Sequence, residues 1–263
     1  MHVPRKRFGQ HFLHDRSVIQ RIVDSINPSP EDAMVEIGPG LGAITRPLLS
    51  RLKRLDAVEI DRDAIAHLRT QFGSSVAGQG ELHVQEADVL DFNFATLRSD
   101  RDLRVVGNLP YNISTPLLFK LIEQRESIHD MHFMLQKEVV DRMAAKAGDE
   151  DYGRLSVMLA PWLQVEPLFD IGPGAFRPPP KVVSTFVRMT PFNSPPFDLG
   201  QPRRFAAVVA AAFSQRRKTL RNSLRALVSA EQMLAAGIDP GARAEVITPE
   251  QFARLANLES PGH

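Results

Sequence analysis

Short apolar segments alternate with amphipathic ones along the chain as far as residue 190, a pattern typical of a parallel sheet whose strands are joined by helices. The predicted strands are residues 34–37, 55–60, 81–85, 105–107, 131–135, 165–171 and 185–189. The last two are expected to form a closing pair. We therefore predict an α/β protein whose sheet is parallel over most of its width.

Polar residues mark the predicted helix starts. Asp15 precedes apolar positions at helical spacing from Val18 to Ile26 and is expected to cap that helix. Thr115 is predicted to cap the helix that follows the strand at 105–107. Thr248, followed by proline, glutamate and glutamine, predicts the capped start of the last helix.

The composition changes after Pro195, where the chain becomes rich in alanine and arginine. We predict a domain boundary there, with residues 1–194 forming the α/β domain and residues 195–263 forming a small helical domain. In the second domain, residues 214–227 predict one helix with a leucine face beside an arginine face at four-residue spacing. These faces are formed by Leu220, Leu224 and Leu227, and by Arg217, Arg221 and Arg225.

The overall composition is that of a soluble globular protein, with 43% hydrophobic and 24% charged residues in 263 positions. The absence of cysteine excludes disulfides, thiolate metal sites and a cysteine nucleophile. His132 has no second histidine at metal-ligand spacing, so we expect no metal, and this residue is expected to face a packed layer. The longest apolar segment, 205–213, is too short to span a bilayer, and no signal peptide is recognisable. A cytoplasmic protein is expected.

Two clusters of basic residues stand out from a net charge of only +1. Residues 1–14 and residues 201–225 each carry several cations and no acid, which favours phosphate binding. For the first cluster, a solvated tail is the alternative interpretation. The candidate nucleic-acid contacts are Arg5, Lys6, Arg7, Arg216, Arg217, Lys218 and Arg221.

A glycine turn and two acids predict a nucleoside cofactor at the ends of the first three strands. Gly38 and Gly40 belong to a Gly-x-Gly-x-Gly turn, which differs from the spacing of pyrophosphate binders. Glu59, about twenty residues further on, is placed to accept both hydroxyls of a ribose. Asp88 is placed to accept an adenine amine. The turn and Glu59 fit NAD as well as S-adenosylmethionine, so an oxidoreductase remains an alternative.

The tetrapeptide Asn108-Leu109-Pro110-Tyr111 follows the fourth strand and predicts chemistry on an amine. The Asn108 carbonyl and neighbouring backbone carbonyls, oriented by Pro110, can draw an exocyclic amine toward a localised lone pair. Tyr111 offers a face for stacking a base. An ordinary strand-to-loop turn is the alternative. Phe176, in a proline-stiffened loop, is either a second stacking surface or a ring packed inward beneath a connector.

Motifs in order along nearly the whole chain resemble those of the ribosomal RNA adenine dimethyltransferases, the family of the KsgA, Dim and Erm enzymes. They are residues 8–13, 36–40, 59–61, 88, 108–111, 176–182 and 215–218. The resemblance implies a class I methyltransferase sheet with a small helical C-terminal domain. It also implies base-stacking by Phe176 and RNA contact by the N-terminal basic residues.

The resemblance further implies S-adenosylmethionine as cofactor, in contact with His11, Leu13, Gly38, Gly40, Glu59, Asp88 and Asn108. Many family members carry asparagine where this chain has His11. The implied reaction is dimethylation of N6 on two adjacent adenosines in the hairpin near the 3′ end of small-subunit rRNA, by a monomer that acts in ribosome biogenesis. A non-catalytic assembly factor, or a methyltransferase of large-subunit rRNA or DNA, remains an alternative.

Overall fold

The computed structural model describes residues 11–73, 80–98, 100–110, 113–215 and 217–258. The chain forms two compact units. Unit 1 consists of Met1–Val140 and Val165–Pro191, and unit 2 consists of Asp141–Gln164 and Phe192–His263.

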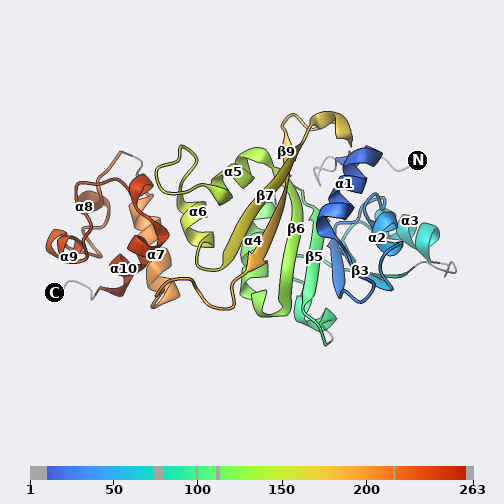
Figure 1. Cartoon of the computed structure of the whole chain (residues 1–263), viewed down its shortest axis with the longest axis horizontal. Helices are drawn as coiled ribbons and strands as arrows, with labels where there is room; N and C mark the ends of the chain where they lie inside the picture. Colours follow the sequence, from blue (N-terminus) through green and yellow to red (C-terminus); the bar gives the residue numbers. More distant parts are fainter. Residues whose placement is uncertain (1–10, 74–79, 99, 111–112, 216, 259–263) are drawn as a thin grey trace. The chain divides into compact units, whose positions relative to one another are not determined.

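Unit 1 is built on a seven-stranded sheet in the order β4-β3-β2-β5-β6-β9-β7 (Figure 1). Its strands are β2 Met34–Ile37, β3 Arg54–Glu59, β4 Glu81–Glu86, β5 Leu103–Asn108, β6 Ile128–Gln136, β7 Leu163–Ile171 and β9 Ser184–Pro191. Strands β2 to β6 run parallel, and β9 is antiparallel to β6. All seven predicted strands and the α/β class are confirmed.

The helices of unit 1 connect these strands. They are α1 Arg16–Ile26, α2 Thr45–Leu49, α3 Arg62–Phe72, α4 Ser114–Glu123 and the first half of α5 Lys137–Ala144, which continues into unit 2 from Asp141, with short 3-10 turns at Phe94–Leu97, Arg125–Ser127 and Pro173–Ala175. The predicted cap of α1 is confirmed, because the Asp15 carboxylate accepts from the backbone N–H of Ser17 and Val18. The predicted cap at Thr115 is wrong: α4 already begins at Ser114, without a side-chain cap.

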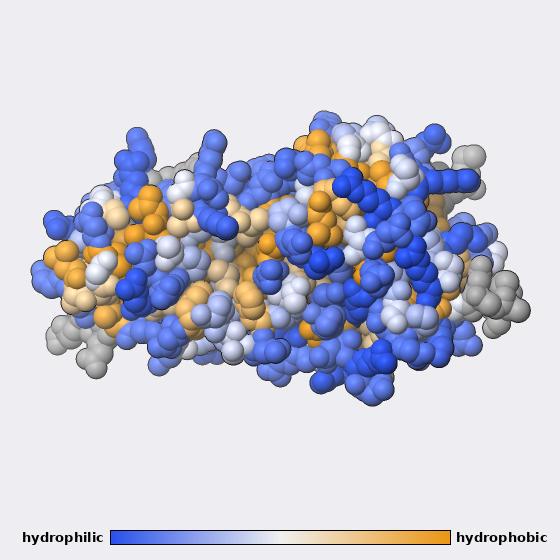
Figure 2. All heavy atoms as spheres, viewed as in Figure 1, coloured by the Kyte–Doolittle hydropathy of each residue, from blue (hydrophilic) through white to orange (hydrophobic). Residues whose placement is uncertain are grey.

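The apolar face of α1 packs on the sheet, which fixes the helix against the strands. Ile22, Val23 and Ile26 are buried in one cluster with Val106 of β5 and Phe186 of β9. In Figure 1, α1 lies in front of the sheet and α4 lies behind it, so helices cover both faces. Hydrophilic side chains cover most of the visible surface of unit 1, with small hydrophobic patches between them (Figure 2).

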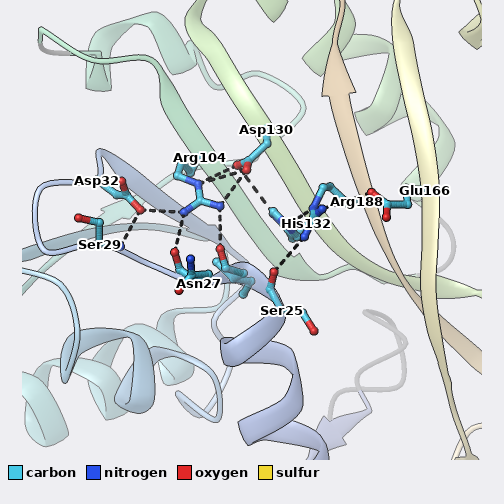
Figure 3. Close-up of polar contacts among 10 residues, drawn as sticks. Ser25, Asn27, Ser29, Asp32, Arg104, Asp130, His132, Glu166 and Arg188 are labelled. Atoms are coloured by element: carbon cyan, nitrogen blue, oxygen red, sulfur yellow. Dashed lines mark hydrogen bonds and ion pairs between the residues drawn. The ribbon is translucent and has the colours of Figure 1, made fainter.

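An arginine from β5 holds the C-terminal end of α1 (Figure 3). Arg104 donates to the carbonyls of Ile26 (2.8 Å) and Asn27 (3.3 Å). The same guanidinium donates to the carboxylates of Asp130 and Asp32, each at 2.8 Å. Carbonyl groups in the last turn of a helix have no partner within the helix, so Arg104 satisfies two of them while the two acids balance its charge.

A second arginine joins the same helix end through a buried histidine (Figure 3). Arg188 donates to the Ser25 carbonyl at 3.1 Å, to Glu166 at 3.2 Å and to Nε2 of His132 at 3.1 Å. Burial lowers the pKa of His132 to about 4, so the ring is neutral near neutral pH. Because Nε2 accepts, the proton lies on Nδ1, which faces Asp130 Oδ1 at 3.7 Å. His132 is therefore buried in a polar network as well as in a packed layer.

Unit 2 has its own helices and its own core. The helices are α6 Arg154–Leu159, α7 Pro202–Ala212, α8 Leu220–Ser223, α9 Ala230–Ala235 and α10 Pro249–Asn257, with a 3-10 turn at Ala244–Val246. Phe205, Val209 and Phe252 are buried in its core. Thr248 caps α10 as predicted, in a capping box with Gln251. Among the helices described in either unit, none has both the length and the apolar character that crossing a bilayer requires.

The division of the chain differs from the predicted boundary after residue 194, both at the boundary itself, because unit 2 already begins at Phe192, and in one earlier segment. Residues 141–164 belong to unit 2, although the sequence pattern placed them with the sheet. The reason is a set of contacts with the C-terminal part of unit 2: the Tyr152 hydroxyl donates to the Ile247 carbonyl at 2.7 Å, and Gly148 N–H donates to the Glu245 carbonyl at 2.9 Å.

The single helix predicted over residues 214–227 is wrong. Helix α7 ends at Ala212, and among the described residues from there to 227 only Leu220–Ser223 is helical. The N–H groups of Leu220 and Arg221 donate to the carbonyls of Ala242 and Pro240, so distant backbone replaces helical partners. The leucines are still directed inward as expected: Leu220 and Leu224 are buried.

Candidate functional site

One cavity of about 1330 Å³ lies at the carboxyl ends of the parallel strands in unit 1. Gly38 directly follows β2, Glu59 ends β3, Asp88 lies two residues after β4, and Asn108 ends β5, and all four line the cavity. Open α/β sheets bind ligands at this edge. The structure thus brings together the strand-end residues that the sequence pattern singled out, together with Gly40, Leu109 and Pro110.

The chain near its N-terminus forms one wall of the cavity. Strand β1 (Phe12–Leu13) pairs antiparallel with β8 (Phe176–Arg177), and His14 N–H donates to the Ala175 carbonyl at 2.9 Å. His11 and Leu13 line the cavity. The His11 Nδ1 lies 2.7 Å from the Pro178 carbonyl, which can only accept, so Nδ1 carries the proton. This contact ties His11 to the residue directly after β8, which lies opposite it in the register of the ribbon.

Phe176 does not line the cavity. Its side chain is 2% exposed and packs in the core beside Leu13, its partner in the ribbon. Arg177 and Pro178, the next residues, line the cavity instead. The base-stacking role expected for Phe176 from the family resemblance does not fit this position. The inward-packed alternative describes it.

The glycine turn brings its backbone close to the N-terminal segment and to Glu59, the residue predicted to bind the ribose. Gly40 has a φ of +56°, and a Cβ on it would approach the Phe12 ring to 3.3 Å. Its N–H donates to Glu59 Oε2 at 3.3 Å. Only glycine combines this backbone conformation with so close a neighbour, which explains why the turn needs glycine here.

Backbone donors hold Glu59 in place. Its Oε1 accepts from the N–H groups of Ile60 and Asp61, both at 2.9 Å. Burial raises the pKa of Glu59, while these hydrogen bonds oppose that effect. Each carboxylate oxygen has a second lone pair, so the oriented group can still accept hydroxyls from a ligand. At the neighbouring strand, Asp88 Oδ1 accepts from Leu90 N–H at 2.9 Å.

Asn108 is oriented by the N-terminal segment. Its Nδ2 donates to the His11 carbonyl at 3.0 Å, which assigns the amide nitrogen to that side. Within the described part of the chain, no donor contacts Oδ1, so the oxygen is left for a ligand amine. The Pro110 carbonyl already accepts from Ile113 N–H at 3.2 Å, and Leu109 is buried. Tyr111 lies outside the described residues.

Sequence reasoning missed Glu36, which lies in the middle of β2 and lines the cavity with 2% of its surface exposed. Burial, together with the negative charge of Glu59, raises the pKa of Glu36 to about 7, although a hydrogen bond from Thr45 opposes the shift. The available signal was an acid within an otherwise apolar strand, since such a residue is rarely buried without a role.

The predicted nucleic-acid contacts fall in different parts of the chain. Arg217, Lys218 and Arg221 are exposed in unit 2. The other candidates, Arg5, Lys6, Arg7 and Arg216, lie outside the described residues. The residues that the structure describes contain no cluster of three or more histidine or carboxylate side chains suited to a metal ion.

A model of a protein family described as ribosomal RNA adenine dimethylase matches residues 1–260. The chain belongs to this family. A relative from Methylococcus capsulatus, named ribosomal RNA small subunit methyltransferase A, is 55% identical and is aligned over 99% of both chains. A protein of the same name from Pseudomonas aeruginosa is 51% identical over 100% of this chain and 97% of its own length.

Solved structures place the fold in the same family. A dimethyladenosine transferase from Plasmodium falciparum superposes with a TM-score of 0.77 at 26% identity, covering 93% of this chain and 96% of its own. The 23S rRNA methyltransferase ErmE gives 0.73 at 27% identity, covering 93% and 98%. The expected Rossmann-like methyltransferase fold is therefore confirmed.

Proposed function

We propose that this member of the rRNA adenine dimethylase family transfers methyl groups from S-adenosylmethionine to N6 of two adjacent adenosines in the hairpin near the 3′ end of small-subunit rRNA. The observation that carries the proposal is the meeting of the glycine turn, Glu59 and Asp88 with Asn108 in one cavity. The small-subunit target rests on the relatives at 51% and 55% identity, whereas ErmE, named for 23S rRNA, is 27% identical.

The cavity residues fit the cofactor by the chemistry of their donors and acceptors. Glu59 is fixed as an acceptor for ribose hydroxyls, and Asp88 uses one oxygen for Leu90, which leaves the other for the adenine amine. Gly38, with a φ of +62°, presents backbone without a side chain at the cavity wall. S-adenosylmethionine, when bound, supplies a methyl group already activated on a sulfonium.

Asn108 supplies the chemistry on the amine. Its Oδ1 accepts a hydrogen bond from the adenine N6, which draws the amine lone pair out of the ring and toward the methyl group. The hydrogen bond to His11 keeps this oxygen directed into the cavity. Correct alignment of the amine with the methyl group lowers most of the remaining barrier, so no general base is needed in the transfer step. The adenine must leave its stack, which costs a few kcal/mol.

The test is methyl incorporation from labelled S-adenosylmethionine into undermethylated small ribosomal subunits, followed by nuclease digestion to identify the base. We expect dimethyladenosine near the 3′ end. Incorporation only into large-subunit RNA or DNA would contradict the target. Binding of NAD but not of S-adenosylmethionine in calorimetry would contradict the reaction. A catalytically inactive variant that still binds the immature subunit would reveal the additional assembly role.

Replacing Arg217, Lys218 and Arg221 together by alanine should weaken RNA binding and flatten its salt dependence. Each lost phosphate contact reduces the slope of log K against log salt by about 0.7–0.9, so three lost contacts reduce it by about 2–3. The measurement is the binding constant for the rRNA hairpin at several salt concentrations. The matched control replaces three exposed arginines of unit 1, Arg69, Arg98 and Arg101, and should keep the slope. Equal slopes in both triple variants would refute this RNA surface.

A further inference from the structure

Two arginines of unit 1 line the cavity without an acidic partner. Arg16 is the first residue of α1, Arg177 is the last residue of β8, and both are exposed. Among the described residues, no carboxylate pairs with either guanidinium. Elsewhere in the same unit such pairs do form, for example between Arg51 and Asp24. The two arginines at the cavity, named the arginine pair below, are therefore free to bind an anion.

Two other charged residues close to the arginine pair are already engaged. Asp15, directly before Arg16 in the chain, uses its carboxylate to accept N–H groups at the start of α1. Arg46, which also lines the cavity, donates to the side-chain oxygen of Gln71 at 3.2 Å. An anion that enters the cavity beside β1 and β8 therefore meets two guanidinium groups whose donors are not in use.

Positive and negative charges lie at different ends of the cavity. The acids that line it lie in or shortly after β2, β3 and β4, and they are Glu36, Glu59 and Asp88. Arg177 lies instead beside the proposed amine acceptor. His11 joins the two, because its carbonyl accepts from Asn108 at 3.0 Å and its Nδ1 donates to the carbonyl of Pro178 at 2.7 Å. Arg16 is on the same side, because β1 pairs with β8 and leads into α1.

We propose that the arginine pair binds the backbone phosphates beside the adenosine that enters the cavity, and thereby positions its N6 at Asn108. The inference rests on the proposed function, in which the target adenosine leaves its stack. A nucleotide that turns into a pocket brings its neighbouring phosphates to the mouth of that pocket, because they are attached to its ribose. A guanidinium suits this position, since it can donate two parallel hydrogen bonds to one phosphate.

Such contacts position the substrate and carry no sequence information. Phosphates are the same beside every base, so the arginine pair fixes the register and orientation of the strand while the cavity reads the adenine. Their loss should therefore lower the rate at which the correct adenosine is methylated without changing which base is modified.

The experiment combines a change in the protein with a change in the RNA. Small subunits are reconstituted with an rRNA whose synthetic 3′ segment carries uncharged methylphosphonates in place of the phosphates that flank the two target adenosines. With the unmodified protein, this replacement should lower kcat/KM for methylation about tenfold, because charge-assisted hydrogen bonds are lost. The double variant Arg16→Gln, Arg177→Gln should show the same loss on unmodified RNA. It should show no further loss on the methylphosphonate RNA, since both changes remove the same contacts.

Matched controls exist on both sides. The double variant Arg69→Gln, Arg101→Gln changes two exposed arginines of unit 1 that do not line the cavity, and it should behave like the unmodified protein. Methylphosphonates placed at the base of the hairpin stem should leave the loss caused by Arg16→Gln, Arg177→Gln at about tenfold. The affinity of that variant for S-adenosylmethionine, measured by calorimetry, should be unchanged.

The outcomes separate this inference from the proposed function. Losses that multiply to about a hundredfold when protein and RNA are both changed would show that the arginines and these phosphates act independently, which overturns the inference. Full kcat/KM of the Arg16→Gln, Arg177→Gln variant would overturn it too. Weaker binding of S-adenosylmethionine would do the same, because it would assign the arginine pair to the carboxylate of the cofactor. Absence of methylation by the unmodified protein would refute the proposed function, and the inference with it.

Discussion

Asn108→Ala should reduce the rate of methyl transfer by about 10²–10³-fold while RNA binding and folding are retained. The expected loss is large because the Oδ1 of this residue is the acceptor placed at the end of β5 for the substrate amine. The alanine variant removes that acceptor and also frees the His11 carbonyl that Nδ2 now occupies. Single-turnover methylation with saturating cofactor measures the chemical step, and RNA binding is measured separately.

Two further variants separate chemistry from positioning. Asn108→Asp keeps an oxygen but loses the N–H donated to His11, so the group is no longer oriented and we expect a loss smaller than that of the alanine variant. Asn93→Ala changes an exposed asparagine outside the cavity, which caps the 3-10 turn at Phe94–Leu97, and should leave the methylation rate unchanged. Near-full activity of Asn108→Ala would refute the assigned role.

The strand-end residues of the cavity were predictable because the relevant physics is local. A buried β-branched strand that stops at a polar residue locates Glu59 and Asn108, and parallel pairing then brings such ends to one edge. His11 was different. The hydrogen bond that joins it to Asn108 spans 97 positions, so only the family resemblance, not any spacing, pointed to it.

Other features depend on tertiary contacts that no local pattern specifies. Residues 214–227 have helical periodicity, yet backbone partners near Pro240 and Ala242 prevent a continuous helix. For Phe176 the residues alone slightly favoured an inward-packed ring and the family resemblance favoured a stacking role; in the structure the ring is buried beside Leu13, its partner in the ribbon. Glu36 gave a weak signal, because its importance depends on the neighbouring strand that carries Glu59.

The polar network around Arg104 could not be predicted from the sequence pattern. Its loss is expected to have the largest effect on stability. Arg104→Ala should lower the free energy of unfolding by about 3–5 kcal/mol. The change leaves Asp130, which is 7% exposed, with a buried charge and no guanidinium. It also leaves the carbonyls of Ile26 and Asn27 without the donors that now satisfy them. Chemical denaturation, followed by circular dichroism, measures the difference.

A second arginine that pairs with an aspartate serves as a control for the effect of burying the arginine. Arg54, at the start of β3, likewise pairs with an aspartate, Asp56, at 2.8 Å, but its side chain is 57% exposed. Water solvates the Arg54 side chain in both states, although Asp56 is buried, and among the described residues Arg54 donates to no helix carbonyl, so Arg54→Ala should cost clearly less than Arg104→Ala. Arg104→Lys should fall between the two, because an ammonium keeps the charge but cannot reproduce the fork of donors. Equal losses for Arg104→Ala and Arg54→Ala would contradict the network as the anchor of α1.

The same substitution connects stability to function through a single helix. Arg104 holds the C-terminal end of α1, while Arg16, Ile19 and Gln20, in the first half of that helix, line the cavity. A rigid helix transmits a shift at one end to the other, so loosening the anchor should weaken cofactor binding even in molecules that remain folded. Cofactor affinity of Arg104→Lys, measured well below its unfolding temperature, checks this. An affinity unchanged despite a clear loss of stability would show that hydrophobic packing of α1 on the sheet suffices to hold the cavity wall.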